Sequence, residues 1–278
     1  MNLEQNLVLS RIETRQRMSK RNSKYIWWLR AMEHSGLLFG NADMGRMFEV
    51  DYLWMREVDD IVDGHLELPH EYATKEQYVM EKRKVLKAVL EPHDRTDGLI
   101  ALSEDLSKKT GIDLQNERDM ILESMLFDAR RFGTRQIFPE QELNEYFYRC
   151  DIEGTARGTL KMFREDPEAH GYIYPLGAAV RIHYNLRDFE EDIQAGYVNV
   201  SEEDCSKFGI TPEDLQNHSS ESVRAWFQSE AVRGMGYLQQ HKDIIGNAGF
   251  KPISRFVIHL YHEIPTQKFI KNILAGAQ

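Results

Sequence analysis

The chain has 278 residues, of which 41% are hydrophobic and 29% charged, a composition that argues against a disordered or membrane-embedded protein and indicates an ordered globular one. Its net charge of −10 argues against a nucleic-acid-binding protein, which would normally carry a basic surplus. No run approaches the roughly 20 apolar residues of a membrane span. We therefore expect a soluble, cytoplasmic protein, and leave peripheral contact with a membrane open.

The cysteines and the N-terminus support this expectation. Cys150 and Cys205 form no CxxC motif, which indicates a reducing compartment with both thiols free. Residues 1–24 mix basic, acidic and apolar side chains, unlike a signal peptide.

Apolar residues recur at intervals of three and four along most of the chain, which predicts helices. Thr211, followed by a proline and two acids, predicts a further helix start. The predicted helices run from Leu29 to Val58 and over 75–91, 97–110, 115–132, 140–164, 172–195, 219–243 and 252–274, with breaks around Pro69, Pro92 and Pro167. We find no repeat and no long linker, so we expect one all-α domain over residues 1–278 whose helices surround a central cavity.

The first acidic cluster lies in the helical stretch that ends near residue 63. Asp59 and Asp63 are four residues apart and share a helix face, and Asp60 lies about 100° round the helix. The neighbours between Tyr52 and Val62 are apolar on most sides, which predicts burial. Buried carboxylates about 4 Å apart repel by roughly 4 kcal/mol at an effective dielectric of 20. A solvated acidic face is the alternative, but the apolar surroundings favour a metal site.

A second acidic cluster contains Asp188, Glu191 and Asp192, and Asp188 and Asp192 again share a helix face. Alone, it would suit a solvated helix end before Gly196 equally well. Together, the two clusters predict a site for Mg²⁺, or alternatively Mn²⁺, because magnesium is usually held by one or two carboxylates, waters and substrate phosphates. Such ions would neutralise a diphosphate and promote ionisation of an allylic C–O bond.

An arginine precedes each cluster. Arg56 and Arg187 could donate charge-assisted hydrogen bonds to the same phosphates. Local ion pairs with the adjacent acids are the equally weighted alternative.

Both clusters resemble motifs of a known family. Arg56–Gly64 is similar to the first aspartate-rich motif of squalene and phytoene synthases, and Leu186–Asp192 is similar to the second. The similarity runs from about Ser35 to Asp204, in the family's order and spacing. It includes Arg46 and Tyr52 before the first motif, and the segments 125–128, 131–134 and 148–159, which fall where the family has its central helices.

The resemblance implies an isoprenoid synthase fold with magnesium bound by Asp59, Asp63, Asp188 and Asp192. Asp60 and Glu191 are further candidate ligands, and Arg46, Tyr52 and Arg131 are candidate substrate-binding residues. Family members join two prenyl diphosphates head to head through a cyclopropyl diphosphate. Some stop there, others form phytoene, and others use NADPH to form squalene. NADPH use, prenyl chain length and oligomeric state stay open here.

The chain departs from the family pattern around the second motif. Arg181 and Tyr184 stand where the family usually has glutamine and asparagine. The segment Gly196–Ser201 replaces Gly-Arg-x-Tyr-Leu-Pro, and so lacks an arginine and a tyrosine that contact phosphate or cation in the family.

The central segment departs as well. Glu153 and Arg157 replace small apolar residues. Being four apart, they could form a helical ion pair with each other. Alternatively they face the cavity as a polar anchor, with added polarity from His183 and Tyr184, either of which could instead be packed in the core.

We therefore expect a magnesium-dependent transferase that couples two prenyl diphosphates head to head. Prenyl transfer to a polar acceptor, or cyclisation, is the alternative within enzymes. A non-catalytic assembly protein derived from the family is the alternative outside them.

Overall fold

The computed structural model describes residues 11–17, 29–30, 34, 36, 41–88 and 98–276. These residues are helical, with no strand among them, which confirms the predicted all-α class. They form two compact units, of which the first runs to Arg130 and takes in Lys161–Phe163, and the second comprises the rest. The single domain and the central cavity expected from the sequence stay predictions. Residues 37–40 and the break around Pro92 lie outside the described ranges.

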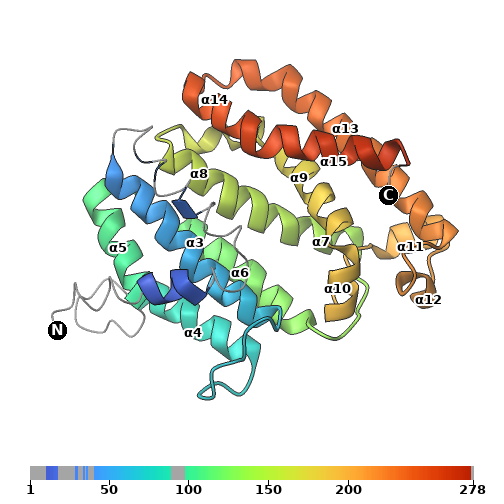
Figure 1. The fold of residues 1–278 in the computed structure, drawn as a ribbon, viewed down its shortest axis with the longest axis horizontal. Coiled ribbons are helices and arrows are strands. Elements are labelled where there is room, and N and C mark those ends of the chain that lie inside the picture. Colours follow the sequence, from blue (N-terminus) through green and yellow to red (C-terminus); the bar gives the residue numbers. More distant parts are fainter. Residues whose placement is uncertain are drawn as a thin grey trace. The chain divides into compact units, whose positions relative to one another are not determined.

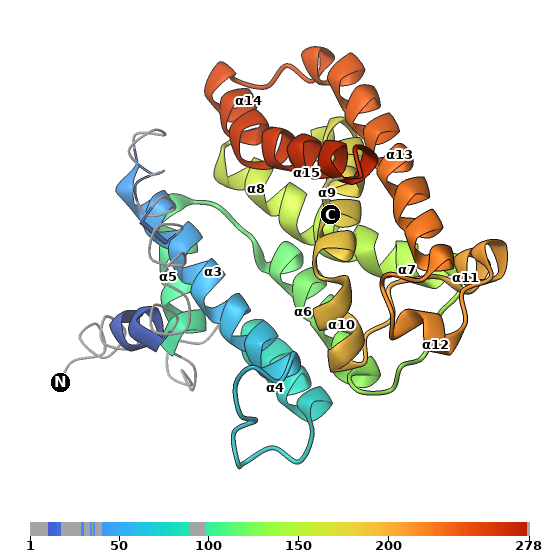
Figure 2. The ribbon, with the colours of Figure 1, turned by 45° about the vertical axis from the view of Figure 1, so that its right-hand side comes forward.

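The first unit is built on one long helix, α3, which carries the first aspartate motif. Its helices are α3 (Ala42–Val62), α4 (Lys75–Ala88), α5 (Gly98–Thr110) and α6 (Gln115–Arg131). The side chain of Asn41 caps α3 by accepting hydrogen bonds from the backbone N–H groups of Asp43 and Met44, at 3.0 and 3.3 Å. α3 packs along α5 (Figures 1 and 2), and buries apolar side chains such as Met47 and Leu53.

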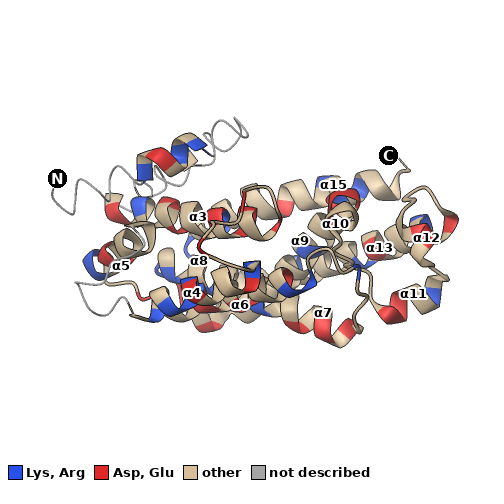
Figure 3. Cartoon of the chain, turned by 90° about the horizontal axis from the view of Figure 1, so that it is seen from below, with Lys and Arg blue, Asp and Glu red and all other residues tan. Residues whose placement is uncertain are grey.

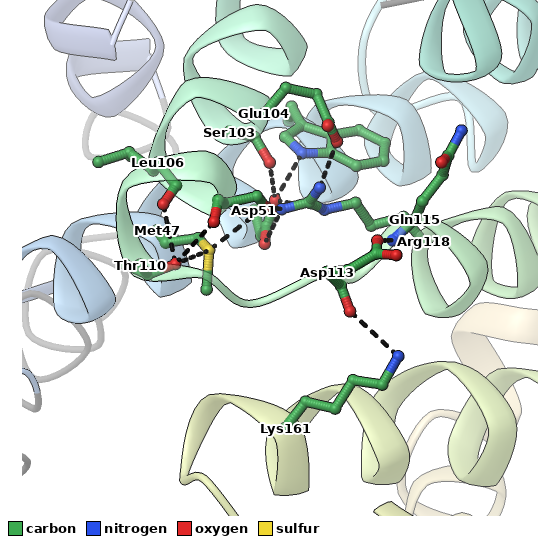
Figure 4. Close-up of polar contacts among 12 residues, drawn as sticks. Met47, Asp51, Ser103, Glu104, Leu106, Thr110, Asp113, Gln115, Arg118 and Lys161 are labelled. Carbon is green, nitrogen blue, oxygen red and sulfur yellow. Dashed lines mark hydrogen bonds and ion pairs between the residues drawn. The ribbon is translucent and has the colours of Figure 1, made fainter. Parts of the chain in front are cut away.

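A buried polar network joins three helices of this unit (Figure 4). Arg118 of α6 donates two hydrogen bonds to the carboxylate of Asp51 on α3, at 3.1 and 3.0 Å. Asp51 also accepts hydrogen bonds from Trp54 and from Ser103 of α5. Arg118 reaches Glu104 of α5 as well. Because Arg118 is 1% exposed and Asp51 4%, each charge depends on the other for compensation.

The second unit packs α9 against α13, and α13 against α15 (Figure 2). Its helical elements are α7 (Glu140–Phe147), the π-helical η1 (Tyr148–Ala156), α8 (Arg157–Met162, whose last two residues belong to the first unit), the 3₁₀ turn η2 (Pro167–Tyr172), α9 (Tyr174–Arg187), α10 (Phe189–Ala195), α11 (Glu202–Phe208), α12 (Pro212–Leu215), α13 (Glu221–Ile244), the 3₁₀ turn η3 (Ile245–Asn247), α14 (Pro252–Ile258), the π-helical η4 (His259–Glu263) and α15 (Ile264–Leu274). Gly234 of α13 permits the close packing, because a Cβ there would lie 2.7 Å from Ile270 Cδ1.

The predicted helices are largely confirmed, and the differences are local. The stretch 140–164 contains the π-helical η1, and 252–274 contains η4. The stretch 172–195 breaks at Asp188, whose φ of −97° and ψ of 7° end α9 and begin α10. α11 was not predicted, although Ser201 caps it and three acids occupy its first turn. The cap at Thr211 is confirmed as a capping box with Asp214.

Two further expectations concern the described residues. No helix in the described ranges has the length and apolarity that a bilayer span requires. Cys150 and Cys205 form no disulfide within this part of the chain.

We predict that Arg118→Met destabilises the protein by about 3–5 kcal/mol, because it leaves the Asp51 carboxylate buried without its counter-charge. The double variant Asp51→Leu/Arg118→Met should recover part of this loss. Urea unfolding measures both. The matched control is Arg130→Ala, which removes an exposed ion pair with Glu76 and should cost no more than about 1 kcal/mol. Equal losses for Arg118→Met and Arg130→Ala would contradict the assigned role of the network.

Candidate active site

The first motif occupies the C-terminal end of α3. Arg56 pairs with Asp59 at 2.7 Å and with Asp60 at 2.8 Å. The backbone N–H of Asp63 donates to the carbonyl of Asp59 at 2.8 Å, so one helical turn separates these aspartates. The last turn of α3 contains no basic residue. Because the C-terminal end of a helix carries partial negative charge, this end favours a bound cation.

Burial distinguishes two carboxylates of this motif, Asp59 and Asp60. The Asp59 side chain is 30% exposed, whereas that of Asp60 is 3% exposed. Burial raises the pKa of Asp59; Arg56 opposes this rise, and Asp128 and Asp60 add to it. Asp59 is therefore the more accessible of these two carboxylates, and Asp60 is buried against Arg56.

Lys75 is a neighbour of this motif that the sequence did not indicate. Its ammonium group donates to the carbonyl of Val62 at 2.7 Å. Burial lowers the pKa of Lys75 to about 8, against the attraction of Asp63. Asp128 of α6 was missed in the same way, because only the fold brings α4 and α6 to the end of α3.

The second motif lies at the junction of α9 and α10. Arg187 forms a bidentate pair with Asp188, at 2.7 and 2.5 Å. The N–H of Asp192 donates to the carbonyl of Asp188 at 2.8 Å, so the predicted one-turn spacing holds although the helix breaks. Burial, with the nearby charge of Asp188, raises the pKa of Asp192 to about 7, against the attraction of Arg131 and a hydrogen bond from Asn199. Glu191 is exposed on α10.

The local ion pairs considered for the two arginines are thus both present. They leave phosphate binding by Arg56 and Arg187 as a prediction, since either guanidinium can bond a carboxylate and a phosphate together. Arg46 on α3 is exposed and pairs with Asp43 at 3.5 Å. Tyr52 is partly buried on the same helix.

Arg131 brings positive charge to the loop after the second motif, where this chain lacks the arginine of the family pattern. Its guanidinium donates to the side-chain carbonyl of Asn199 at 2.8 Å and lies over the rings of Tyr146 and Tyr197, at 5.0 and 4.8 Å. The Asn199 amide in turn donates to Asp192 at 2.8 Å. Asn199 therefore connects a buried arginine to a motif carboxylate.

Glu153 and Arg157 do not form the ion pair that a regular helix would allow. Arg157 pairs with Glu168 of η2 at 2.8 Å, and no bond joins it to Glu153 in the part of the chain that the structure describes. The reason is local: Glu153 lies within η1, and its wider π-helical turns change which residues stack.

His183 and Tyr184 occupy different surroundings. His183 is buried, stacked on Phe269 at 4.3 Å and hydrogen bonded to Thr266 at 3.2 Å, which confirms the core-packed interpretation of this residue. Tyr184 is exposed, and the Arg187 guanidinium lies 4.6 Å from its ring centre.

A cavity of about 170 Å³ lies within the second unit. Its wall carries two ion pairs: Arg181 holds Asp151 at 2.7 and 2.6 Å, and Arg233 holds Glu230 at 2.5 Å. Burial raises the pKa of Glu230 to about 7, against the opposing effect of Arg233. Two more carboxylates, Glu140 and Asp204, belong to the lining. More than half of the remaining lining residues are aromatic or amide: Phe147, Tyr148, Tyr174, Trp226, Tyr237, Asn144, Asn185 and Asn199. The cavity therefore offers hydrogen-bonding groups that a pure hydrocarbon cannot use.

The carboxylates of the two motifs are suited to divalent cations that retain other ligands. Among the described residues, no three His, Cys, Asp or Glu side chains form a single cluster for a metal. Each motif instead offers a pair of aspartates one turn apart, and in each pair burial and a neighbouring carboxylate raise the pKa of one member. Magnesium commonly binds in this way, with water and phosphate oxygens completing its shell. The two motifs lie on different units, and their action on one substrate stays a prediction.

Comparison with known proteins agrees with the motifs. The model of the squalene/phytoene synthase family matches residues 36–265. The 15-cis-phytoene synthase of Synechococcus elongatus is 28% identical over 204 residues, covering 68% of this chain and 63% of that protein. Phytoene synthase 1 of Solanum lycopersicum is 27% identical over 184 residues, covering 65% and 43%. The chain thus spans less than two thirds of the length of these relatives.

Solved structures show the same fold. The squalene synthase HpnC from Alicyclobacillus acidocaldarius has a TM-score of 0.73 at 14% identity, covering 98% of this chain and 95% of that one. A dehydrosqualene synthase has a TM-score of 0.65 at 16% identity, covering 99% of both chains. The fold is that of the helical isoprenoid synthases, and the chain belongs to the squalene/phytoene synthase family.

Proposed function

We propose that this protein is a magnesium-dependent transferase that ionises a prenyl diphosphate and joins two prenyl chains head to head. The observation that carries the proposal is the pair of aspartates, one turn apart, in each of two family motifs. In each pair one carboxylate is held partly buried beside another, which raises its pKa. A bound cation would relieve that repulsion.

Asp59, Asp63, Asp188 and Asp192 would hold magnesium, or manganese, with Asp60 and Glu191 as further candidates. The metal would supply positive charge to the diphosphate leaving group. Arg56 orients Asp59 through an ion pair. Asn199 orients Asp192 by donating a hydrogen bond to it, and Arg131 in turn donates one to Asn199. The allylic C–O bond breaks with its electron pair on the diphosphate, the double bond of the second chain attacks the carbon cation, and loss of a proton closes the cyclopropane ring and discharges the cation that this attack leaves on the second chain.

We predict that Asp59→Asn and Asp188→Asn each lower magnesium-dependent diphosphate release. The loss should exceed the roughly 10–100-fold that is typical for residues that only support a metal ligand. The assay uses farnesyl and geranylgeranyl diphosphate, with and without NADPH, and mass analysis of the products. Asp243→Asn, which changes an exposed aspartate of α13, is the matched control.

The products separate the alternatives. A doubled carbon count supports head-to-head coupling. Diphosphate release with only single-chain products contradicts coupling and leaves ionisation standing. If both aspartate variants behave as the wild type, the protein is not this enzyme, and the assembly-protein alternative gains.

We also predict that Asp192→Asn stabilises the metal-free protein at pH 8. The pKa of Asp192 rises from 3.8 to about 7 in the folded state, so folding is penalised progressively as the pH rises between these values and fully above them. The gain should be on the order of 2 kcal/mol at pH 8, allowing for partial solvent screening, and absent near pH 4.

Magnesium provides the complementary measurement. It should raise the thermal midpoint of the wild type, because a ligand that binds the folded state stabilises it. It should not raise the midpoint of Asp192→Asn. Glu190→Gln, an exposed acid on the same helix, serves as the control and should keep the shift. A full magnesium shift in Asp192→Asn would remove this residue from the metal site.

A second candidate function is prenyl transfer to a polar acceptor, and the charged cavity favours it. Arg181 replaces the glutamine usual in the family, and its pair with Asp151 lines that cavity. The acceptor would sit there, and its heteroatom would attack the carbon cation and lose a proton.

The double variant Arg181→Gln/Asp151→Asn discriminates the two candidates without leaving either charge unpaired. For head-to-head coupling we predict that diphosphate release and the doubled product are kept within about threefold, because neither charged group contacts a hydrocarbon chain. For a polar acceptor, adduct formation in the presence of a cell extract should fall more than tenfold while diphosphate release continues. The measurement is mass analysis of both product classes from one reaction.

A further inference from the structure

The cavity of the second unit carries an unbalanced charge. Its lining contains four carboxylates and two guanidinium groups, which belong to Glu140, Asp151, Asp204, Glu230, Arg181 and Arg233. Four negative and two positive formal charges leave a surplus of two negative charges. Arg181 and Asp151 neutralise each other through two hydrogen bonds of 2.7 and 2.6 Å. The surplus therefore belongs to the other three carboxylates.

These three carboxylates, which we name the acid cluster, come from three helices. Glu140 is the first residue of α7, Asp204 lies in the acidic first turn of α11, and Glu230 lies on α13. The acidic residues of α7 and α11 are red in Figure 3. Among the described residues, the basic side chain that pairs with the cluster is Arg233, at 2.5 Å from Glu230 and 3.4 Å from Glu140. One guanidinium thus serves three carboxylates.

Glu230 is the buried member of the acid cluster, with only 6% of the residue exposed. Its Oε2 accepts the hydrogen bond from Arg233, and Asp204 uses its Oδ2 to accept one from Trp226 at 3.0 Å. In the part of the chain that the structure describes, the second oxygen of each carboxylate has no hydrogen-bond partner. Two buried or partly buried acceptor atoms are therefore available to a ligand in the cavity.

The charges around Glu230 favour a further cation. Burial raises the pKa of Glu230 to about 7; Arg233 opposes this rise, and Asp204 and Glu140 add to it. A positive charge beside Glu230 would relieve the repulsion between the carboxylates.

Aromatic side chains decide what kind of cation fits. Tyr148, Tyr174, Trp226 and Tyr237 line the same cavity, and the ring centres of Tyr148 and Tyr174 are 5.8 Å apart. Aromatic rings attract organic cations and also contact apolar chains. A bare metal ion fits less well, because the described residues offer no cluster of three ligands for one. Carboxylates beside aromatic rings are suited to an ammonium group on an alkyl chain.

We propose that this cavity binds an aliphatic diamine with both of its amino groups protonated. Glu230 and Asp204 accept hydrogen bonds from an ammonium group, and the methylene chain lies against the aromatic side chains. The two positive charges of the ligand balance the two surplus negative charges of the lining. The inference names an acceptor class for the second candidate function and rests on that function in this respect only, because binding does not require the reaction.

The test is isothermal titration calorimetry of the full chain with 1,4-diaminobutane at pH 8, without a prenyl diphosphate. Excess magnesium is present to compete for the motif aspartates. The diamine should bind at least tenfold more tightly than 1,4-butanediol, a neutral molecule with the same carbon chain, because only the diamine carries charge. Butylamine, with one positive charge, should lie between them.

Two variants locate the binding. Glu230→Gln and Asp204→Asn should each weaken diamine binding about tenfold, as expected when a hydrogen bond to a charged group is lost. The matched controls are Glu221→Gln and Glu202→Gln, which change exposed acids on α13 and α11, and both should bind within about twofold of the wild type. Thermal midpoints check that each variant is folded.

Three results would overturn the proposal. The first is a wild type that binds 1,4-diaminobutane no more tightly than 1,4-butanediol. The second is tighter binding of succinate, which would assign the cavity to an anion held by its arginines. The third is a control variant that weakens binding as much as its counterpart in the acid cluster. Diphosphate release is measured separately, so diamine binding without release contradicts the proposed function alone, and release without diamine binding contradicts this inference alone.

Discussion

The buried pair of Asp51 and Arg118 fixes the helix on which the first motif depends. It lies about two helical turns before Asp59 on α3. It joins that helix to α6, and Arg118 also pairs with the partly buried Glu104 of α5. α3 is thus anchored to two neighbouring helices before it reaches the motif at its C-terminal end. At that end, Arg56 of the same helix, Lys75 of α4 and Asp128 of α6 lie close enough to act on the charges of the aspartates.

The second motif is positioned by a different device, a helix that stops and restarts. Asp188 closes α9 and opens α10, so its carboxylate and that of Asp192 keep their one-turn relation while the chain changes direction. Asn199, in the loop that follows α10, donates a hydrogen bond to Asp192 and accepts one from Arg131. This chain has no arginine after the motif, but Arg131, which is distant in the sequence, contacts the same loop through Asn199.

The long helices and both motifs could be predicted from sequence because their causes are local. Spacing of apolar residues, the cap at Thr211 and the one-turn separation of aspartates each depend on a few neighbouring positions. The break at Asp188 and the wide turns of η1 and η4 could not, since nothing in the residue types forbids a regular helix there. The contact between Arg131 and Asn199 joins residues 68 positions apart. Arg157 forms its ion pair with Glu168 and not with Glu153. Such partners are chosen by tertiary packing, which a single sequence does not reveal.

The wide turns of η1 have a geometric consequence for its two neighbours. A π-helical segment holds more residues per turn than the α-helices on either side of it. Its winding therefore determines how the side-chain faces of α7 and α8 are rotated relative to each other. Because a π-helical turn holds more residues than an α-helical turn, the segment accommodates its residues without the rotation of about 100° that each additional residue adds in a regular helix. If the same residues wound as a regular α-helix, α7 would rotate relative to α8, and Leu143 and Tyr146, which are buried on α7, would turn away from the core. The winding of this segment therefore determines which side chains of α7 face inward.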